Sequence, residues 1–191
     1  MNQRRDARNP LPLIAAGVAL VLVVGFLVYW FAIRDDSKKD NSPTKPKPLA
    51  AQTFSAPGAS FSFKYPGDFV QTLPTGGYVF IASIDTYDLI SVKRLQNFAT
   101  SPATLKKTVP STLTVVPGTT IKNQGTDQRD GIPMITYAID TMLGGQQVAV
   151  KLYYFSSNNV TWQIACESQH QATRVNAACS GALASFKGPQ G

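Results

Sequence analysis

Apolar and polar positions alternate with a period of two through much of the chain after residue 53, which predicts a series of half-buried β-strands. The first run begins at Phe61, ends at Tyr65 and is followed by Pro66-Gly67, a turn signal. Further turn signals at Asp130-Gly131 and Gly144-Gly145 separate later runs. The expected strands cover residues 61–65, 69–72, 78–83, 88–95, 119–128, 133–140, 146–155 and 160–166.

Two segments have a helical pattern instead. Ser101 followed by Pro102 provides an N-cap and a proline at the first helical position, so a helix is expected to begin there. We expect this helix to be short, because Pro110 and Pro117 would interrupt it. From His170 onward apolar residues recur every three or four positions, which predicts an amphipathic helix with one buried stripe. The stripe consists of Val175, Ala178, Cys179, Ala182, Leu183 and Phe186.

Together these patterns define the fold class. Seven or eight short strands with tight turns, one short helix and one terminal helix predict an α+β domain. In such a domain, helices cover an antiparallel sheet.

A separate apolar run, residues 11–33, begins at Leu11 and ends at Ile33 without a charged residue. A helix of this length is about 34 Å long, enough to cross the roughly 30 Å hydrocarbon core of a bilayer. The alternative is a cleaved signal peptide, whose apolar region is about 7–15 residues long and ends in small residues. This run ends in bulky residues around Trp30, so we expect an uncleaved single-pass anchor.

The expected organisation has five parts. Residues 1–10 form a leader, residues 11–33 a transmembrane helix, residues 34–53 a Lys/Pro-rich stalk, residues 54–187 the folded domain and residues 188–191 a tail. The polar, proline-rich composition of the stalk cannot bury a core and favours extended polyproline II structure.

The orientation of the anchor depends on the two cysteines of the chain, Cys166 and Cys179. Basic residues flank both ends of the apolar run in nearly equal number, so the positive-inside rule does not discriminate. A cysteine pair beside a membrane anchor indicates a disulfide in an oxidising compartment; two buried free thiols in a cytosolic domain are the alternative. We therefore expect a cytoplasmic N-terminus, an extracytoplasmic domain and a disulfide that joins the last strand to the last helix.

The net charge of +7 does not indicate a nucleic-acid partner. Residues 1–48 account for +4 of it, where the basic residues flank the membrane segment, and residues 49–191 carry only +3. The domain has no basic run interleaved with aromatic residues that would indicate a nucleic-acid partner.

No catalytic, cofactor-binding or metal-binding set is evident in the sequence. The nucleophile-elbow, zinc-protease, P-loop and dinucleotide-binding motifs are all missing from the chain. His170 is the only histidine and is expected to be exposed at the start of the last helix. A structural zinc site needs four ligands, which one histidine and a bonded cysteine pair do not supply. We expect neither an enzyme nor a cofactor.

The stretch Phe61-x-Phe63-x-Tyr65-Pro-x-x-Phe69, followed by antiparallel strands, a mid-chain helix and a terminal helix, resembles the Mog1/PsbP-like superfamily. The ending is most similar to the secreted LpqN-like bacterial members, with WQIAC at residues 162–166 and ALASF at residues 182–186. The resemblance implies an α/β/α sandwich used mainly for binding and scaffolding. No family motif assigns a catalytic or ligand-binding residue here.

We expect the protein to be a membrane-anchored, extracytoplasmic, non-catalytic binding or scaffold domain of the bacterial cell envelope, with a protein or envelope component as its partner. An alternative is a small-molecule or lipid-binding domain with an aromatic-lined pocket on the sheet, and an envelope hydrolase is a third possibility. The adjacent Tyr153 and Tyr154 would point to opposite faces of the sheet. The aromatic residues considered for such a pocket are Phe61, Phe63, Tyr65, Tyr78, Phe80, Tyr137, Tyr153, Tyr154, Phe155 and Trp162.

Overall fold

An antiparallel sheet forms the centre of the domain in a computed structural model, which describes residues 50–98 and 100–189. The described strands are β1 (Gln52–Ser55), β2 (Ser62–Tyr65), β3 (Val70–Thr72), β4 (Tyr78–Ser83), β5 (Leu89–Leu95), β6 (Thr120–Arg129), β7 (Ile132–Leu143), β8 (Gln146–Ser157) and β9 (Val160–Ser168). The main sheet has the order β3-β4-β5-β9-β8-β7-β6, and β1 and β2 form a separate two-stranded sheet. All eight expected strands are confirmed, with ends shifted by at most three residues.

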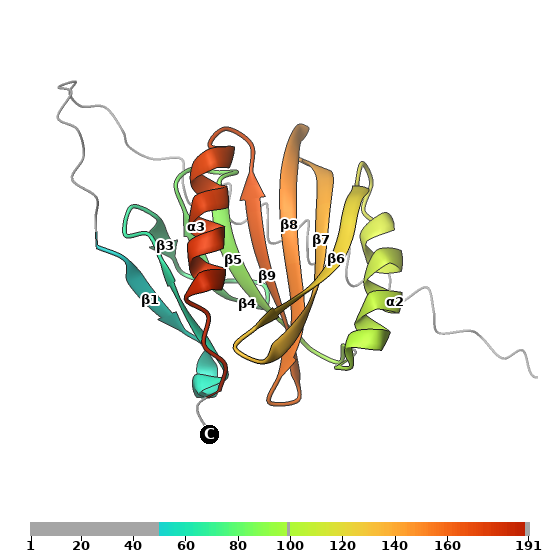
Figure 1. Cartoon of the computed structure of the whole chain (residues 1–191). Helices are drawn as coiled ribbons and strands as arrows, with labels where there is room; N and C mark the ends of the chain where they lie inside the picture. Colours follow the sequence, from blue (N-terminus) through green and yellow to red (C-terminus); the bar gives the residue numbers. More distant parts are fainter. Residues whose placement is uncertain (1–49, 99, 190–191) are drawn as a thin grey trace, which may run out of the picture. The chain divides into compact units, whose positions relative to one another are not determined.

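Helices cover both faces of the main sheet (Figure 1). Helix α3 (Ala172–Ala184), together with β1 and β2, packs on the face to which Trp162 and Ile164 point, here called the α3 face. Helix α2 (Pro102–Thr114) packs on the opposite face, here called the α2 face, to which Ala165 points. The expected antiparallel α+β fold with helices on the sheet is therefore confirmed.

The strand β1 was not expected from the sequence. Its residues Gln52–Ser55 include one apolar side chain, Phe54, and so give no alternating pattern. It forms because β2 offers a free edge, and the pairing brings Phe54 opposite Phe63 in the core. The first described strand therefore begins at Gln52, two residues before the expected start of the domain at residue 54.

The aromatic side chains of β2 point into the core on the α3 face. Phe61 lies at the centre, with its ring centroid 5.1 Å from those of both Phe155 and Trp162. Phe63 and Tyr65 pack on Phe80 at 5.6 Å and 4.9 Å. The Pro66-Gly67 turn ends this strand, and the alternation predicted for it is confirmed.

Helix α2 is longer than expected, because Pro110 lies inside it instead of ending it. A proline cannot donate the backbone hydrogen bond to the carbonyl four residues earlier, which here belongs to Lys106. The Tyr137 hydroxyl of β7 donates to that carbonyl at 3.4 Å. A buried side chain of the sheet thus supplies the donor that the proline lacks, and the helix continues to Thr114.

The expected disulfide between Cys166 and Cys179 is present and joins β9 to α3. Both cysteines are buried. The rest of the helix stripe is rich in alanine, which buries little apolar area, so the covalent link adds stability where packing alone contributes less.

The expected leader, transmembrane helix and most of the stalk lie outside the described residues. Among the residues that the structure describes, no helix is long and apolar enough to cross a membrane.

Removing the disulfide should destabilise the domain. We expect Cys166→Ala/Cys179→Ala to lower the free energy of unfolding by about 3 kcal/mol, the chain-entropy effect of a loop of this size. Urea denaturation measures this change. Wild-type protein unfolded with a reductant should match the double variant, and an unchanged midpoint in both cases would contradict the prediction.

The contact between Tyr137 and Pro110 can be tested by a double-mutant cycle. Tyr137→Phe should cost about 1 kcal/mol, because it leaves the Lys106 carbonyl without its donor. The cost should shrink in a Pro110→Ala background, where the new backbone N–H can donate to that carbonyl. Equal costs in both backgrounds, measured by urea denaturation, would show that the two residues are independent.

Candidate functional site

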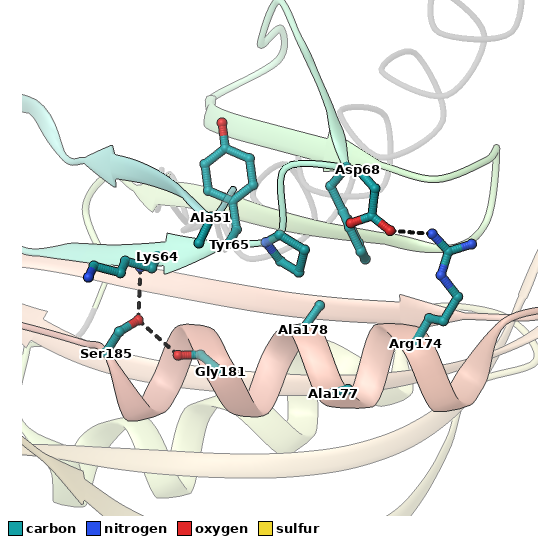
Figure 2. A pocket seen from close by; sticks show the side chains of 11 residues that line it. Ala51, Lys64, Tyr65, Asp68, Arg174, Ala177, Ala178, Gly181 and Ser185 are labelled. Carbon is teal, nitrogen blue, oxygen red and sulfur yellow. Dashed lines mark hydrogen bonds and ion pairs between the residues drawn. The ribbon is translucent and has the colours of Figure 1, made fainter. Parts of the chain in front are cut away.

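A groove of about 520 Å³ lies between α3 and the segment that follows β2 (Figure 2). Its middle is formed by small or apolar side chains, and polar groups lie at its two ends. The residues that line it are Ala51, Lys64, Tyr65, Pro66, Asp68, Phe69, Arg174, Ala177, Ala178, Gly181 and Ser185.

The helix side of the groove consists of residues without large side chains. Ala177 and Gly181 are exposed on it, one helical turn apart. A Cβ atom built on Gly181 would have no atom within 4 Å. Packing inside the domain therefore does not require a glycine at this helical position.

Each end of the groove is fixed by a polar contact between α3 and the β2 side. At one end Arg174 forms an ion pair with Asp68. At the other end the backbone N–H of Lys64 donates to Ser185 Oγ at 2.8 Å. The width of the groove is thus held at both ends.

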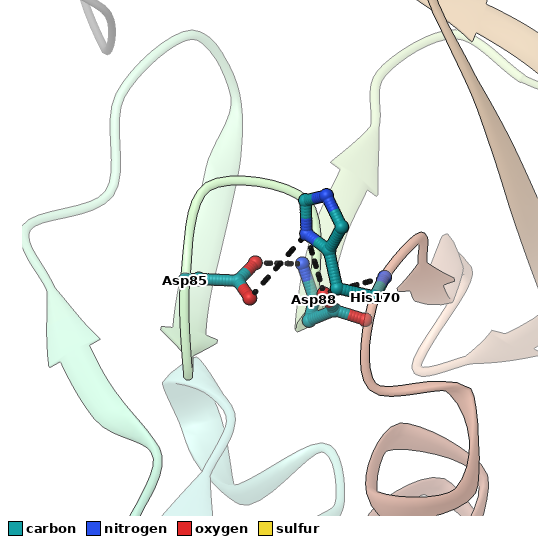
Figure 3. Close-up of side chains that lie close together, drawn as sticks. All are labelled: Asp85, Asp88 and His170. Carbon is teal, nitrogen blue, oxygen red and sulfur yellow. Dashed lines mark hydrogen bonds and ion pairs between the residues drawn. The ribbon is translucent and has the colours of Figure 1, made fainter.

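A second cluster of polar side chains lies where the β4–β5 loop meets the start of α3 (Figure 3). The Asp88 carboxylate is fully buried and accepts three backbone N–H groups from the β9–α3 connection. They belong to Gln169 (3.1 Å), His170 (3.0 Å) and Gln171 (2.9 Å). Only Gln171 of these three residues belongs to the end of α3: it is the N-cap, and its own side chain makes no capping bond. From the β4–β5 loop, Asp88 thereby caps this residue and fixes the connection that leads into the helix.

Asp85 orders the loop that presents Asp88. One of its carboxylate oxygens accepts the backbone N–H groups of Tyr87 at 3.0 Å and Asp88 at 2.9 Å. Burial alone would raise the pKa of the Asp85 carboxyl, but the hydrogen bonds it accepts outweigh burial and hold that pKa below its usual value. Asp85 is therefore charged at neutral pH.

His170 joins this cluster through its side chain. Its Nδ1 atom lies 3.5 Å from Asp88 Oδ2 and 3.7 Å from Asp85 Oδ2. The expected exposure of His170 is confirmed, since 59% of its side chain is accessible to solvent. Its expected position is also close, because α3 begins two residues later, at Ala172.

The three side chains also have the chemistry of metal ligands, and their ligand atoms all lie within 4.8 Å of one another. Asp88, however, already uses its carboxylate to bind backbone N–H groups at the positive end of a helix dipole. A cation there would compete with these donors. The geometry therefore fits a structural cap better than a metal centre.

Sequence reasoning missed the role of Asp88, because 81 residues separate it from Gln169, the first residue it binds. The only local sign is the Asp85-x-x-Asp88 spacing in a loop, which is common in turns.

Most of the aromatic residues considered for a pocket on the sheet lie in the core instead. Tyr153 and Tyr154 do point to opposite faces, as predicted: Tyr154 is buried on the α2 face, and Tyr153 is half-buried on the α3 face. The fully or almost fully buried members of the set are Phe61, Phe63, Tyr65, Phe80, Tyr137, Phe155 and Trp162.

Comparison with known proteins supports the fold. No protein-family model and no curated protein sequence matches the chain. The solved structure of cyanobacterial PsbP (CyanoP) from Synechocystis sp. PCC 6803 matches with a TM-score of 0.53 at 14% identity, over 78% of this chain and 98% of that one. LpqN of Mycobacterium tuberculosis, described as involved in cell envelope biogenesis, matches with a TM-score of 0.51 at 14% identity, over 73% and 92%.

A structure from Bacteroides thetaiotaomicron VPI-5482 matches with a TM-score of 0.53 at 12% identity. The match covers 72% of this chain but 48% of that one, so this chain spans about half the length of the Bacteroides protein. The domain therefore has a PsbP-like fold, and the resemblance to PsbP and LpqN is confirmed at the level of the fold. Similarity at these identities carries no site residue across.

Replacing Asp88 should loosen the attachment of α3. We expect Asp88→Asn to lower the free energy of unfolding by about 2 kcal/mol, because charge-assisted hydrogen bonds of about 1.5–3 kcal/mol are weakened or lost. Hydrogen exchange at residues 169–171 should accelerate. Asp68→Asn, which breaks a surface ion pair, serves as a control that should cost less than about 1 kcal/mol. Equal costs for the two variants would contradict the capping role.

Proposed function

We propose that the protein is a membrane-anchored, non-catalytic binding domain of the bacterial cell envelope. Its folded part would lie outside the cytoplasm and bind a protein or another envelope component. The support comes from the apolar run of residues 11–33, the disulfide between Cys166 and Cys179, and the PsbP-like fold.

The disulfide supports the extracytoplasmic placement. Reducing conditions keep cytosolic thiols free, so a structural disulfide fits a domain that folds in an oxidising compartment. With the domain outside, residues 11–33 would act as the anchor and leave residues 1–10 in the cytoplasm.

The groove beside α3 is the surface that we assign to partner binding, and Gly181 is the observation that carries this assignment. A glycine inside a helix costs about 0.5–1 kcal/mol relative to alanine. At Gly181 nothing in the domain would clash with a Cβ atom, so the fold gains nothing from the glycine. A partner that packs closely on the helix backbone would explain its presence.

The groove favours a macromolecular partner over a small ligand. Its middle offers small side chains and buried aromatic edges from Tyr65 and Phe69, while its two ends are closed by contacts within the domain. Close packing of a partner backbone against such a surface needs few specific polar groups.

Two substitutions of Gly181 test the stability of the domain and its partner binding separately. Gly181→Ala should stabilise the domain by about 0.5–1 kcal/mol. Gly181→Trp should fill the groove, keep the fold and abolish partner binding. Photo-cross-linking from Ala177 in intact cells, read by mass spectrometry, measures that binding.

The matched control places the cross-linker at Gln124, an exposed residue of β6 on the other side of the molecule's main sheet. An adduct that forms from Ala177, is missing from Gln124 and disappears with Gly181→Trp supports the proposal. An adduct that persists in Gly181→Trp, or no adduct from Ala177 at all, would exclude the groove as the binding surface.

A further inference from the structure

A part of the α3 face that no described helix covers has the features of a carbohydrate-binding surface. We propose that this surface, formed by β6, β7 and β8, binds a neutral envelope glycan. The inference rests on the proposed extracytoplasmic placement, and it concerns a surface separate from the groove beside α3. The surface, here called the open strip, consists of Gly125, Thr136, Ala138, Ala149, Lys151 and Tyr153.

The strip is open because α3 packs toward one side of the sheet. The main contacts of α3 are with β2, β5 and β9. Figure 1 shows no helix over the upper part of β8 and β7 beside α3. The β6–β7 hairpin crosses in front of their lower part toward the segment that follows α3, where the Gly188 N–H donates to Asp130 Oδ2 at 2.7 Å. All members of the strip are exposed or half-exposed. A ligand can therefore reach the strip between the helix and the hairpin.

The strand register places the members of the strip in consecutive rows. Gly125, Thr136 and Tyr153 lie opposite one another across β6, β7 and β8, and Ala138 and Lys151 form part of the next row. Ala149 belongs to the row after that, so the strip extends over about 14 Å along the strands. This length suits a chain of a few sugar rings rather than a single small molecule.

The centre of the strip is flat, because its side chains are small. A Cβ atom on Gly125 would lie 3.0 Å from Thr136 Oγ1, tighter than ordinary contact. Because Gly125 has no side chain, the space beside the hydroxyl of the half-buried Thr136 stays free. A planar ring can approach the sheet here and hydrogen bond to that hydroxyl.

Two polar groups of residues flank the strip, and most of their charges are paired. At one end Lys122 Nζ lies 3.1 Å from Asp140 Oδ2, to which Gln147 also donates at 3.2 Å. At the other end Arg129 and Asp127 are paired at 2.9 Å. The ion pairs hold these side chains in place and leave each group with little net charge. Their remaining donor and acceptor atoms can still hydrogen bond to a ligand.

Tyr153 adds an aromatic surface next to the Asp127–Arg129 pair. Burial and the Asp127 carboxylate raise the pKa of the Tyr153 phenol, while Arg129 opposes this, so all three groups are close neighbours. Its half-buried ring offers an apolar face beside polar atoms. Sugars present the same combination, with apolar C–H faces and hydroxyl edges.

The same features argue against other ligand classes. An acyl chain would bury the paired charges without replacing their contacts with water, which costs free energy. A polyanion would find one unpaired cation among the described residues of the strip, Lys151, which is too few for salt-dependent binding.

The test measures glycan binding by the full-length protein in detergent micelles. The probes are soluble chitotetraose, followed by ligand-observed saturation-transfer NMR, and insoluble chitin, a neutral polymer of the same sugar, followed by co-sedimentation. Ala149→Glu, at an exposed position, should block the strip without disturbing the core and weaken binding at least tenfold. Tyr153→Leu should weaken it similarly by removing the ring.

The matched control is Thr126→Glu, an exposed β6 residue on the α2 face. Binding that Ala149→Glu and Tyr153→Leu weaken and Thr126→Glu leaves unchanged supports the inference. The inference is overturned if neither probe binds, or if all three variants bind equally well.

Protease treatment of intact cells separates this inference from the proposed function. Release of the domain with no glycan binding would overturn the inference and leave the proposed function standing. Full protection of the domain would overturn the extracytoplasmic placement, and the glycan inference would fall with it.

Discussion

The attachment of α3 to the sheet is the constraint on which the rest of the domain depends. The buried stripe of this helix contains two alanines, Ala178 and Ala182, which bury little apolar area. Polar and covalent links add to that burial: Asp88 holds the start of the helix, the disulfide its middle and Ser185 its end. Because the helix is fixed off-centre, it borders a groove on one side and leaves part of the sheet open on the other.

The sequence pattern predicted the strands well, because successive side chains of a strand point alternately to the two faces of the sheet. One face is buried in a core, and the other is either exposed or buried in the second core. It failed where structure depends on a distant partner. Strand β1 needs the free edge of β2, and α2 passes through Pro110 because Tyr137 hydrogen bonds to the carbonyl of Lys106. Local patterns contain no information about either partner.

The candidate surfaces were harder to predict than the fold. The disulfide could be predicted from the even number of cysteines and the apolar run that precedes the domain. The groove and the open strip consist of small residues such as Ala177, Gly181 and Gly125, which carry no motif. They become recognisable only when the strand order places them on one surface. Asp88 was similarly hidden, because its partners lie at the far end of the chain.

The pairing of β5 with β9 also sets the order in which the domain can fold. Leu89 lies opposite Glu167, so the two strands can pair only after the chain between them has been synthesised. Contacts of such long sequence separation slow folding. Strands β3 to β5 must therefore wait for the C-terminal part of the chain, and a nascent chain remains incompletely folded until β9 has been synthesised.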